Sequence, residues 1–216
     1  MEKQVVSKKR VADHGEVLTG KREVNAMLDL VKQETERIES RFLEPACGTG
    51  NFLSEILKRK LRVVEFRYEK IQLEYERNAV LAVSSIYGID ILKDNVQECR
   101  KRLFDIFDLN YTRLFIFGAR NECRDAVKYI LERNIIHGDA LDLKTVENNP
   151  RPIIFSEWSP VNGSMLKRRD FMLSFLVDKQ HQLMIFSDEN NEAYLNEPVK
   201  EYPLTHFLEV ADVDRQ

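Results

Sequence analysis

The chain has 216 residues, of which 43% are hydrophobic and 32% are charged, and its formal net charge is −3. This length and balance are typical of one soluble globular domain with a substantial core. No run of about 18 apolar residues occurs, and no apolar segment follows the charged N-terminus, so we expect neither a membrane span nor a secretory signal. The three widely spaced cysteines, Cys47, Cys99 and Cys123, argue against a disulfide framework and a metal site, and indicate a reducing cytoplasm.

Basic residues are clustered only locally, at 8–10, 58–62 and 167–169. A surface that binds nucleic acid on its own usually carries a basic excess, which the net charge of −3 does not provide. We therefore expect these clusters to be solvated faces rather than phosphate-binding patches.

Helical and extended segments alternate along most of the chain. Apolar spacing predicts helices over 22–39, 51–60, 62–83, 92–108 and around 126–131. Strands are predicted at 41–44, 85–90, 134–140 and 152–156, whereas residues 109–119 carry no clear pattern. This alternation predicts an α/β fold with a doubly wound, mostly parallel sheet.

The pattern changes after Pro150. Asn162 and Gly163 lie between apolar runs and predict a hairpin turn. Residues 165–177 fit a strand or a helix, and residues 183–186 are predicted as a strand. We expect a helical segment at 1–40, followed by one domain over 41–216 with a shortened C-terminal part.

The stretch from Arg41 to Leu53 reads as strand, glycine turn and helix. Such a unit presents backbone N–H groups to a ligand at the carboxyl edge of a sheet. Gly48 and Gly50 allow the backbone to approach the ligand closely and to adopt positive φ, and Asn51 can cap the helix that follows. An ordinary strand-to-helix turn is the alternative, and the residues on either side of the glycines count against it.

The run Glu44-Pro45-Ala46-Cys47-Gly48-Thr49-Gly50 resembles the S-adenosylmethionine loop of adenine-specific (N6) DNA methyltransferases of restriction-modification systems. It differs from the dinucleotide fingerprint because no third glycine follows at the required offset. The resemblance implies a Rossmann-like methyltransferase sheet and S-adenosylmethionine as cofactor. The implied loop contacts are Glu44, Pro45, Ala46, Cys47, Gly48, Gly50, Asn51 and Phe52.

Two acidic residues follow the next two strands. Asp90 can accept hydrogen bonds from ribose hydroxyls, or it can cap the helix predicted at 92–108. The resemblance implies that Asp139 accepts a hydrogen bond from the adenine amino group, and the alternative is an exposed turn residue. Ile89 and Ala140 would supply apolar walls for the ring, and Ile91, beside Asp90, belongs to the predicted site. His137 is expected to be a packed residue at the strand end.

The loop at 14–20 resembles, loosely, the segment G-x-Y/F-x-T-P that precedes the first helix in this family. Gly15, Glu16 and Thr19 match it, whereas Gly20 stands where proline is usual. The resemblance implies that Thr19 reaches the methionine carboxylate. The alternative is a plain loop in which Thr19 caps the next helix.

The sequence departs from the family at the reaction site. Family members carry Asn-Pro-Pro-Tyr, or Asp in place of Asn, after the fourth strand, to hold the flipped adenine. Here the strand leads into Ser156-Glu157-Trp158-Ser159-Pro160, with no Asn-Pro-Pro. The run Asn148-Asn149-Pro150 lies before the strand, at the wrong end for this motif. Glu157 could accept a hydrogen bond and Trp158 could stack on a base, but a core position for Trp158 is at least as well supported.

The predicted activity is S-adenosylmethionine-dependent methyl transfer to adenine N6 in DNA. About 60 residues after the fourth strand leave no room for a separate target-recognition domain, so we expect DNA binding to involve a partner subunit or domain. The alternative is a catalytically inactive, cofactor-binding subunit or regulatory module. A methyltransferase acting on a small molecule, protein or RNA is a third possibility.

Overall fold

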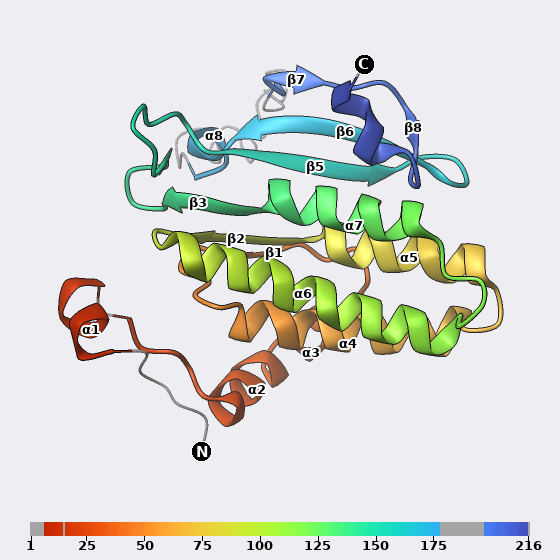
Figure 1. Cartoon of the computed structure of the whole chain (residues 1–216), viewed down its shortest axis with the longest axis horizontal. Helices are drawn as coiled ribbons and strands as arrows, with labels where there is room; N and C mark the ends of the chain where they lie inside the picture. The colour runs from red at the N-terminus through yellow and green to blue at the C-terminus, as the bar shows by residue number, and fades with distance from the viewer. Residues whose placement is uncertain (1–6, 15, 178–196, 216) are drawn as a thin grey trace, which may run out of the picture.

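The structure is a computed structural model that describes residues 7–14, 16–177 and 197–215, and it contains two sheets (Figure 1). The first sheet has the order β1-β2-β3-β4. The parallel strands β1, β2 and β3 pair side by side, and β4 is antiparallel to β3. The strands span Phe42–Glu44 (β1), Ile86–Asp90 (β2), Ile135–Asp139 (β3) and Lys144–Thr145 (β4).

Helices cover one face of this sheet and surround the starts of its strands. Figure 1 shows α4 and α6 on one side of the sheet and the second sheet on the other. The helices are α1 (Lys8–His14), α2 (Lys21–Asp29), α3 (Lys32–Thr35), α4 (Asn51–Tyr68), α5 (Gln72–Ser84), α6 (Lys93–Leu114) and α7 (Asn121–Asn134). Val24 and Leu28 of α2 are buried in the same core as Leu57 of α4, so α2 shares the core of the domain.

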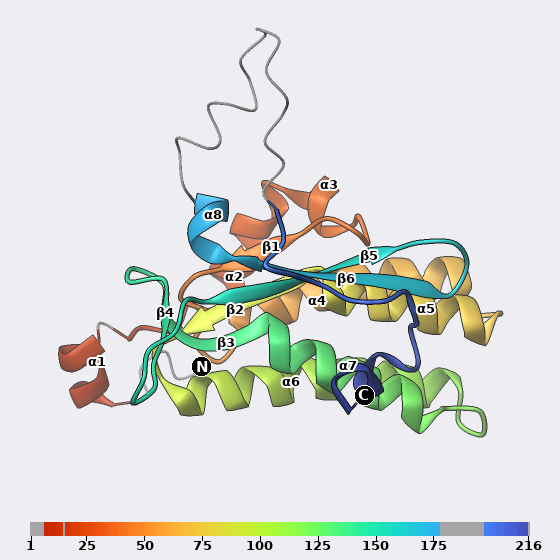
Figure 2. The same cartoon turned by 90° about the horizontal axis from the view of Figure 1, so that it is seen from above.

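The second sheet is a long hairpin with short additions. Strands β5 (Ile154–Pro160) and β6 (Met165–Met172) are antiparallel, and β7 (Lys200–Glu201) and β8 (Thr205–His206) pair with β6. The short helix α8 (Leu173–Val177) follows β6, and a 3-10 helix, η1 (Val210–Arg215), follows β8. Seen from above in Figure 2, the hairpin loop reaches over α5.

Strand β2 forms the centre of the fold because both of its faces are buried. Ile86 belongs to the main core, while Tyr87 and Ile89 pack against Phe155 of β5. The Tyr87 hydroxyl donates a hydrogen bond to the Ser156 carbonyl at 3.0 Å. The β5–β6 hairpin thus covers the face that the helices leave open.

Two predicted helix boundaries were wrong. The segment predicted as one helix over 22–39 forms α2 and α3, because Val31 leaves helical geometry and its side chain, like that of Met27, stays exposed. The helices predicted at 51–60 and 62–83 divide at residues 69–71 instead of near 61. Helix α4 continues because Leu61 and Val64 are buried in the core that its first turns also line.

The hairpin turn at Asn162 and Gly163 is confirmed, but the expected place of the fourth strand in the parallel sheet was wrong. Gly163 has φ 61°, and the Val161 N–H donates to the Met165 carbonyl at 2.9 Å. Strand β5 pairs along its whole length with β6, antiparallel, in a separate sheet. Residues 165–177 form a strand and then a short helix, and the strand predicted at 183–186 lies outside the described residues.

The expectation that the basic clusters are solvated was wrong for several of their members. Arg59, Lys60 and Arg168 are buried. The Lys60 ammonium donates hydrogen bonds to the Ile38 carbonyl at 3.0 Å, the Ser85 hydroxyl at 2.6 Å and the Ser40 carbonyl. Lys60 therefore joins α4 to the residues before β1 and β2. Burial lowers the pKa of Lys60 to about 7.

The substitution Lys60→Met tests this buried amine. In the unfolded chain lysine titrates near pH 10.4, so between about pH 7 and 10 the unfolded state binds a proton that the folded state has lost. The free energy of unfolding of the wild type should therefore rise with pH relative to that of Lys60→Met. The limiting slope is about 1.4 kcal/mol per pH unit. Urea unfolding at several pH values, followed by circular dichroism, measures the difference, and parallel pH profiles for the two proteins would contradict the lowered pKa.

Candidate functional site

A cavity of about 540 Å³ opens at the carboxyl ends of β1, β2 and β3. This volume is in the range of small-molecule sites, about 300–1,000 Å³. The residues predicted to bind the cofactor line it, with two exceptions. Gly50 does not line it, and Ile89, predicted as an apolar wall for the adenine ring, is buried in the cluster that contains Phe155. These lining residues are Thr19, Glu44, Pro45, Ala46, Cys47, Gly48, Asn51, Phe52, Asp90, Ile91, Asp139 and Ala140.

The glycine turn has the geometry that its sequence requires. Gly48 has φ 52° and Gly50 has φ 83°, a region that side chains other than glycine rarely adopt. A Cβ atom on Gly50 would lie 2.7 Å from the Cys99 sulfur, so this glycine is needed for packing behind the turn rather than for lining the cavity. Gly50 precedes the first residue of α4, so the helix cap is Gly50 and not Asn51.

Asp90 anchors the turn at the end of β2. Asp90 is 8% exposed, and its Oδ2 accepts a hydrogen bond from the Gly48 N–H at 2.8 Å. The other oxygen, Oδ1, accepts from the Leu92 N–H at 2.8 Å and from the Asn95 amide at 3.2 Å. The carboxylate therefore holds the backbone that leads into α6, but Asp90 is not the helix cap, which is Leu92. Asp90 also lines the cavity. A carboxylate has about four acceptor positions, which leaves capacity for a ligand.

Glu44 is the second carboxylate of the cavity. It ends β1, and burial raises the pKa of its carboxyl. Among the described residues, no ion pair and no hydrogen bond involves this side chain. A partly desolvated carboxylate of this kind is stabilised by a cationic ligand group.

The rim beyond β3 combines a turn acid with apolar side chains. Asp139 Oδ1 accepts hydrogen bonds from the Leu141 N–H at 2.8 Å and the Asp142 N–H at 3.3 Å, which is the turn role given as its alternative. Leu141 and Ile91 line the cavity while 93% and 43% exposed, so apolar surface is available to a ligand. His137 packs at the strand end, where its Nε2 lies 3.0 Å from the Ile91 carbonyl oxygen.

The N-terminal loop closes the opposite side, and sequence reasoning missed part of it. Glu16, Val17, Leu18 and Asn95 also line the cavity. Asn95 donates to Glu16 Oε1 at 2.7 Å, and the Arg10 guanidinium donates to both residues, at 2.8 and 2.9 Å. The loose match of Glu16 to the family segment was the signal for this loop.

Asn51 connects this loop to α4. Its side-chain amide donates to the Thr19 carbonyl at 2.8 Å, and its Oδ1 accepts from Arg102 at 2.6 Å. The first turn of α4 is therefore fixed to both the N-terminal loop and α6.

The two weak catalytic candidates lie away from the cavity. Trp158 is 4% exposed in the main core, and its indole N–H donates to Asn134 Oδ1 at 3.1 Å. Glu157 forms ion pairs with Arg169, at 2.7 Å, and with Arg41. The contacts of Trp158 with Asn134 and of Glu157 with Arg41 thus fix the β5–β6 hairpin to its neighbours, whereas Glu157 and Arg169 pair within the hairpin.

Two further properties bear on the kind of site. Within the described ranges, no group of three or more His, Cys, Asp or Glu side chains is placed to hold a metal ion. In the same part of the chain, no helix combines the length and apolar character needed to cross a membrane.

Comparison with known proteins identifies the family. The model of the family described as "MmeI, DNA-methyltransferase domain" matches residues 18–151, which is more than half of the chain and includes every residue that lines the cavity except Glu16 and Val17. No curated protein and no solved structure was found to match. The match confirms the resemblance of the glycine loop to those of DNA methyltransferases. The chain belongs to the family of MmeI DNA-methyltransferase domains.

Proposed function

We propose that the chain is an S-adenosylmethionine-dependent DNA methyltransferase domain of the adenine-N6 type, from a restriction-modification system. The observation that carries this proposal is the convergence of Glu44, Asp90 and Asp139 on one cavity, from the ends of three adjacent parallel strands. Membership of a DNA-methyltransferase family supports DNA as the macromolecular substrate.

The methionine part would lie over the glycine turn. The unpaired Glu44 carboxylate, whose pKa is raised by burial, suits a cationic amino or sulfonium group. The methionine carboxylate would lie near Thr19 and the first turn of α4, where the positive end of the helix dipole favours an anion.

The nucleoside part would extend from β2 to β3. Asp90 has acceptor capacity left for ribose hydroxyls, and Asp139 would accept a hydrogen bond from the adenine amino group. Ile91, Ala140 and Leu141 would pack against the ring. All of these residues border the same cavity, so one extended ligand can reach each of them.

Methyl transfer requires placement more than acid–base chemistry. When bound, the cofactor supplies an electrophilic methyl group on a positively charged sulfur. The protein has to hold the target amine in line with the methyl carbon and exclude water. Transfer would form a nitrogen–carbon bond as the carbon–sulfur bond breaks, and the amine nitrogen would release a proton to solvent or a nearby acceptor.

A second candidate function is a cofactor-binding module without catalytic activity. It is supported by the absence of Asn-Pro-Pro-Tyr from the sequence and by the engagement of Glu157 and Trp158 in the hairpin. Both candidates require cofactor binding, so they differ only in the transfer step.

Calorimetric titration with S-adenosylmethionine tests the shared requirement. We expect micromolar binding by the wild type and about tenfold weaker binding by Glu44→Gln, because the charge-assisted contact to the amino group is lost. Glu147→Gln is the matched control, since Glu147 is exposed and does not line the cavity. Absence of binding by the wild type, or equal affinities of the two variants, would contradict the assignment.

Asp90→Ala should affect the fold as well as the ligand. The variant leaves the N–H groups of Gly48 and Leu92 without their acceptor, so we expect a loss of about 1–3 kcal/mol in stability without cofactor. Asp139→Ala is the control, because its turn is accessible to water. Thermal unfolding of the unliganded proteins measures the effect. A thermal midpoint of Asp90→Ala equal to that of the wild type would contradict the anchoring role.

Transfer of a labelled methyl group to unmethylated DNA separates the two candidates. If the first is correct, label enters DNA and nucleoside digestion recovers it as N6-methyladenine. Cofactor binding without incorporation of label into DNA, at protein concentrations above the dissociation constant for the cofactor, would favour the non-catalytic module.

A further inference from the structure

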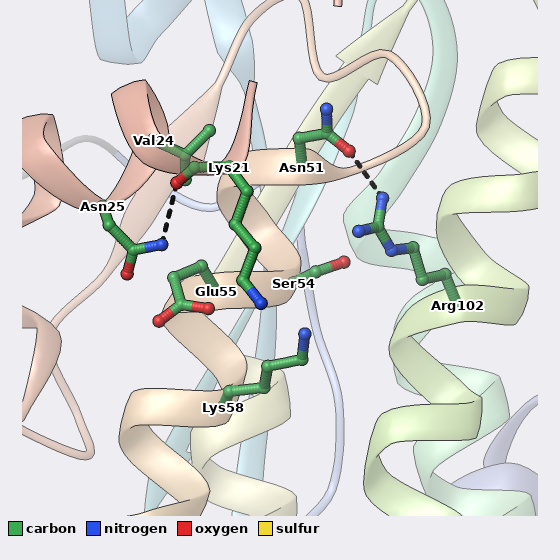
Figure 3. Close-up of a pocket in the computed structure, with 8 residues that line it drawn as sticks. All are labelled: Lys21, Val24, Asn25, Asn51, Ser54, Glu55, Lys58 and Arg102. Carbon is green, nitrogen blue, oxygen red and sulfur yellow. Dashed lines mark hydrogen bonds between the residues drawn. The ribbon is translucent and has the colours of Figure 1, made fainter. Parts of the chain in front are cut away.

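A second cavity lies between α2, α4 and α6, and Asn51 lines both this cavity and the first one (Figure 3). Its volume is about 70 Å³, several times the ~15 Å³ that a single water needs. One face of α4 contributes Asn51, Ser54, Glu55 and Lys58, spaced as successive turns of a helix. Lys21 of α2 and Arg102 of α6 complete the polar lining, and Figure 3 shows the ends of Lys21 and Lys58 extending into the same region.

The charge in this cavity is positive. None of the ion pairs found among the described residues involves Lys21, Lys58 or Arg102. The one acid in the lining, Glu55, is paired with Arg59 at 3.4 Å. Arg59 is in turn paired with Asp29 at 2.8 Å. Three cationic side chains therefore face a space whose nearest carboxylate already has a partner.

Ser54 provides an independent sign of a missing ligand. The residue is 1% exposed, and its hydroxyl has no hydrogen-bond partner. A buried polar group left unpaired costs about 1–3 kcal/mol, so such groups usually mark an absent water, ion or ligand. Ser54 belongs to the first turns of α4, where the helix dipole favours an anion over a cation.

We propose that this cavity is a binding site for a phosphate group. Lys21 and Lys58 supply the countercharge, and Ser54 donates a hydrogen bond. Arg102 supplies the guanidinium N–H groups that are not donated to Asn51 Oδ1 or the Thr49 carbonyl. A water could satisfy the hydroxyl but would leave the cations uncompensated. The cavity has room for more than one water, which leaves space for a small oxyanion. The phosphate group would come either from free inorganic phosphate or from a DNA backbone.

Titration calorimetry with sodium phosphate, at constant ionic strength in chloride, tests the site without cofactor or activity. We expect saturable binding by the wild type and binding weaker by about tenfold in Lys58→Met, which removes one charge-assisted contact. Lys70→Met is the matched control, because Lys70 is exposed in the turn between α4 and α5. Ser54→Ala, which keeps all charges, should weaken phosphate binding without changing the circular dichroism spectrum.

Competition with a short DNA duplex identifies the source of the phosphate group. If the site receives a DNA backbone, inorganic phosphate displaces the duplex, and Lys58→Met weakens binding of both ligands. If it receives free phosphate, the duplex leaves phosphate affinity unchanged. No saturable binding of either ligand, or equal losses in Lys58→Met and Lys70→Met, would overturn the proposal.

Discussion

The carboxylate of Asp90 is the interaction on which the site depends. It accepts hydrogen bonds from the backbone of the glycine turn on one side and from the start of α6 on the other. Gly48 and Asp90 are 42 positions apart in the chain, with α4 and α5 between them. One buried carboxylate therefore sets the position of the turn relative to the sheet. The cavity above the turn has a defined shape because this contact is part of the fold.

The second constraint is that both faces of β2 must be covered. Helices α4 and α6 cover one face, and in a doubly wound fold helices would also cover the other. Here the β5–β6 hairpin takes that place, with Phe155 against Tyr87 at a centroid distance of 5.2 Å. The same hairpin carries Trp158 into the core beside α7, with its ring edge-on to Tyr129. A strand used to cover the sheet cannot also present its side chains at the carboxyl edge, which accounts for the positions of Glu157 and Trp158.

The residues of the cavity at the carboxyl ends of β1, β2 and β3 were predictable because their arrangement follows from local rules. Strand ends meet at one edge of a parallel sheet, so the loop after β1, Asp90 and Asp139 had to converge once the strands were recognised. The helix boundaries were less predictable. Met27 and Val31 have core spacing but stay exposed, whereas Leu61 continues a helix through the boundary that was predicted near it.

The burial of charged residues was also outside the reach of sequence reasoning. Lys60 looks like one member of a surface cluster, and only the carbonyls of distant segments make its burial tolerable. The partner of β5 depends in the same way on which face of the sheet is left uncovered. Such outcomes depend on tertiary contacts that local propensity does not contain.

The three cysteines should react slowly with thiol reagents in the folded protein. All of them are free and buried. The pKa of the Cys47 thiol is raised mainly by its contact with the Cys99 thiol and further by burial. Burial also raises the pKa of the Cys123 thiol. Thiol reagents attack the thiolate, so alkylation of the native protein has to wait for a local opening. Because Cys47 lies in the glycine turn and Cys99 directly behind Gly50, the rates at which these two thiols are alkylated should report how often the turn opens. Any ligand that holds the turn closed should slow the alkylation of Cys47 and Cys99.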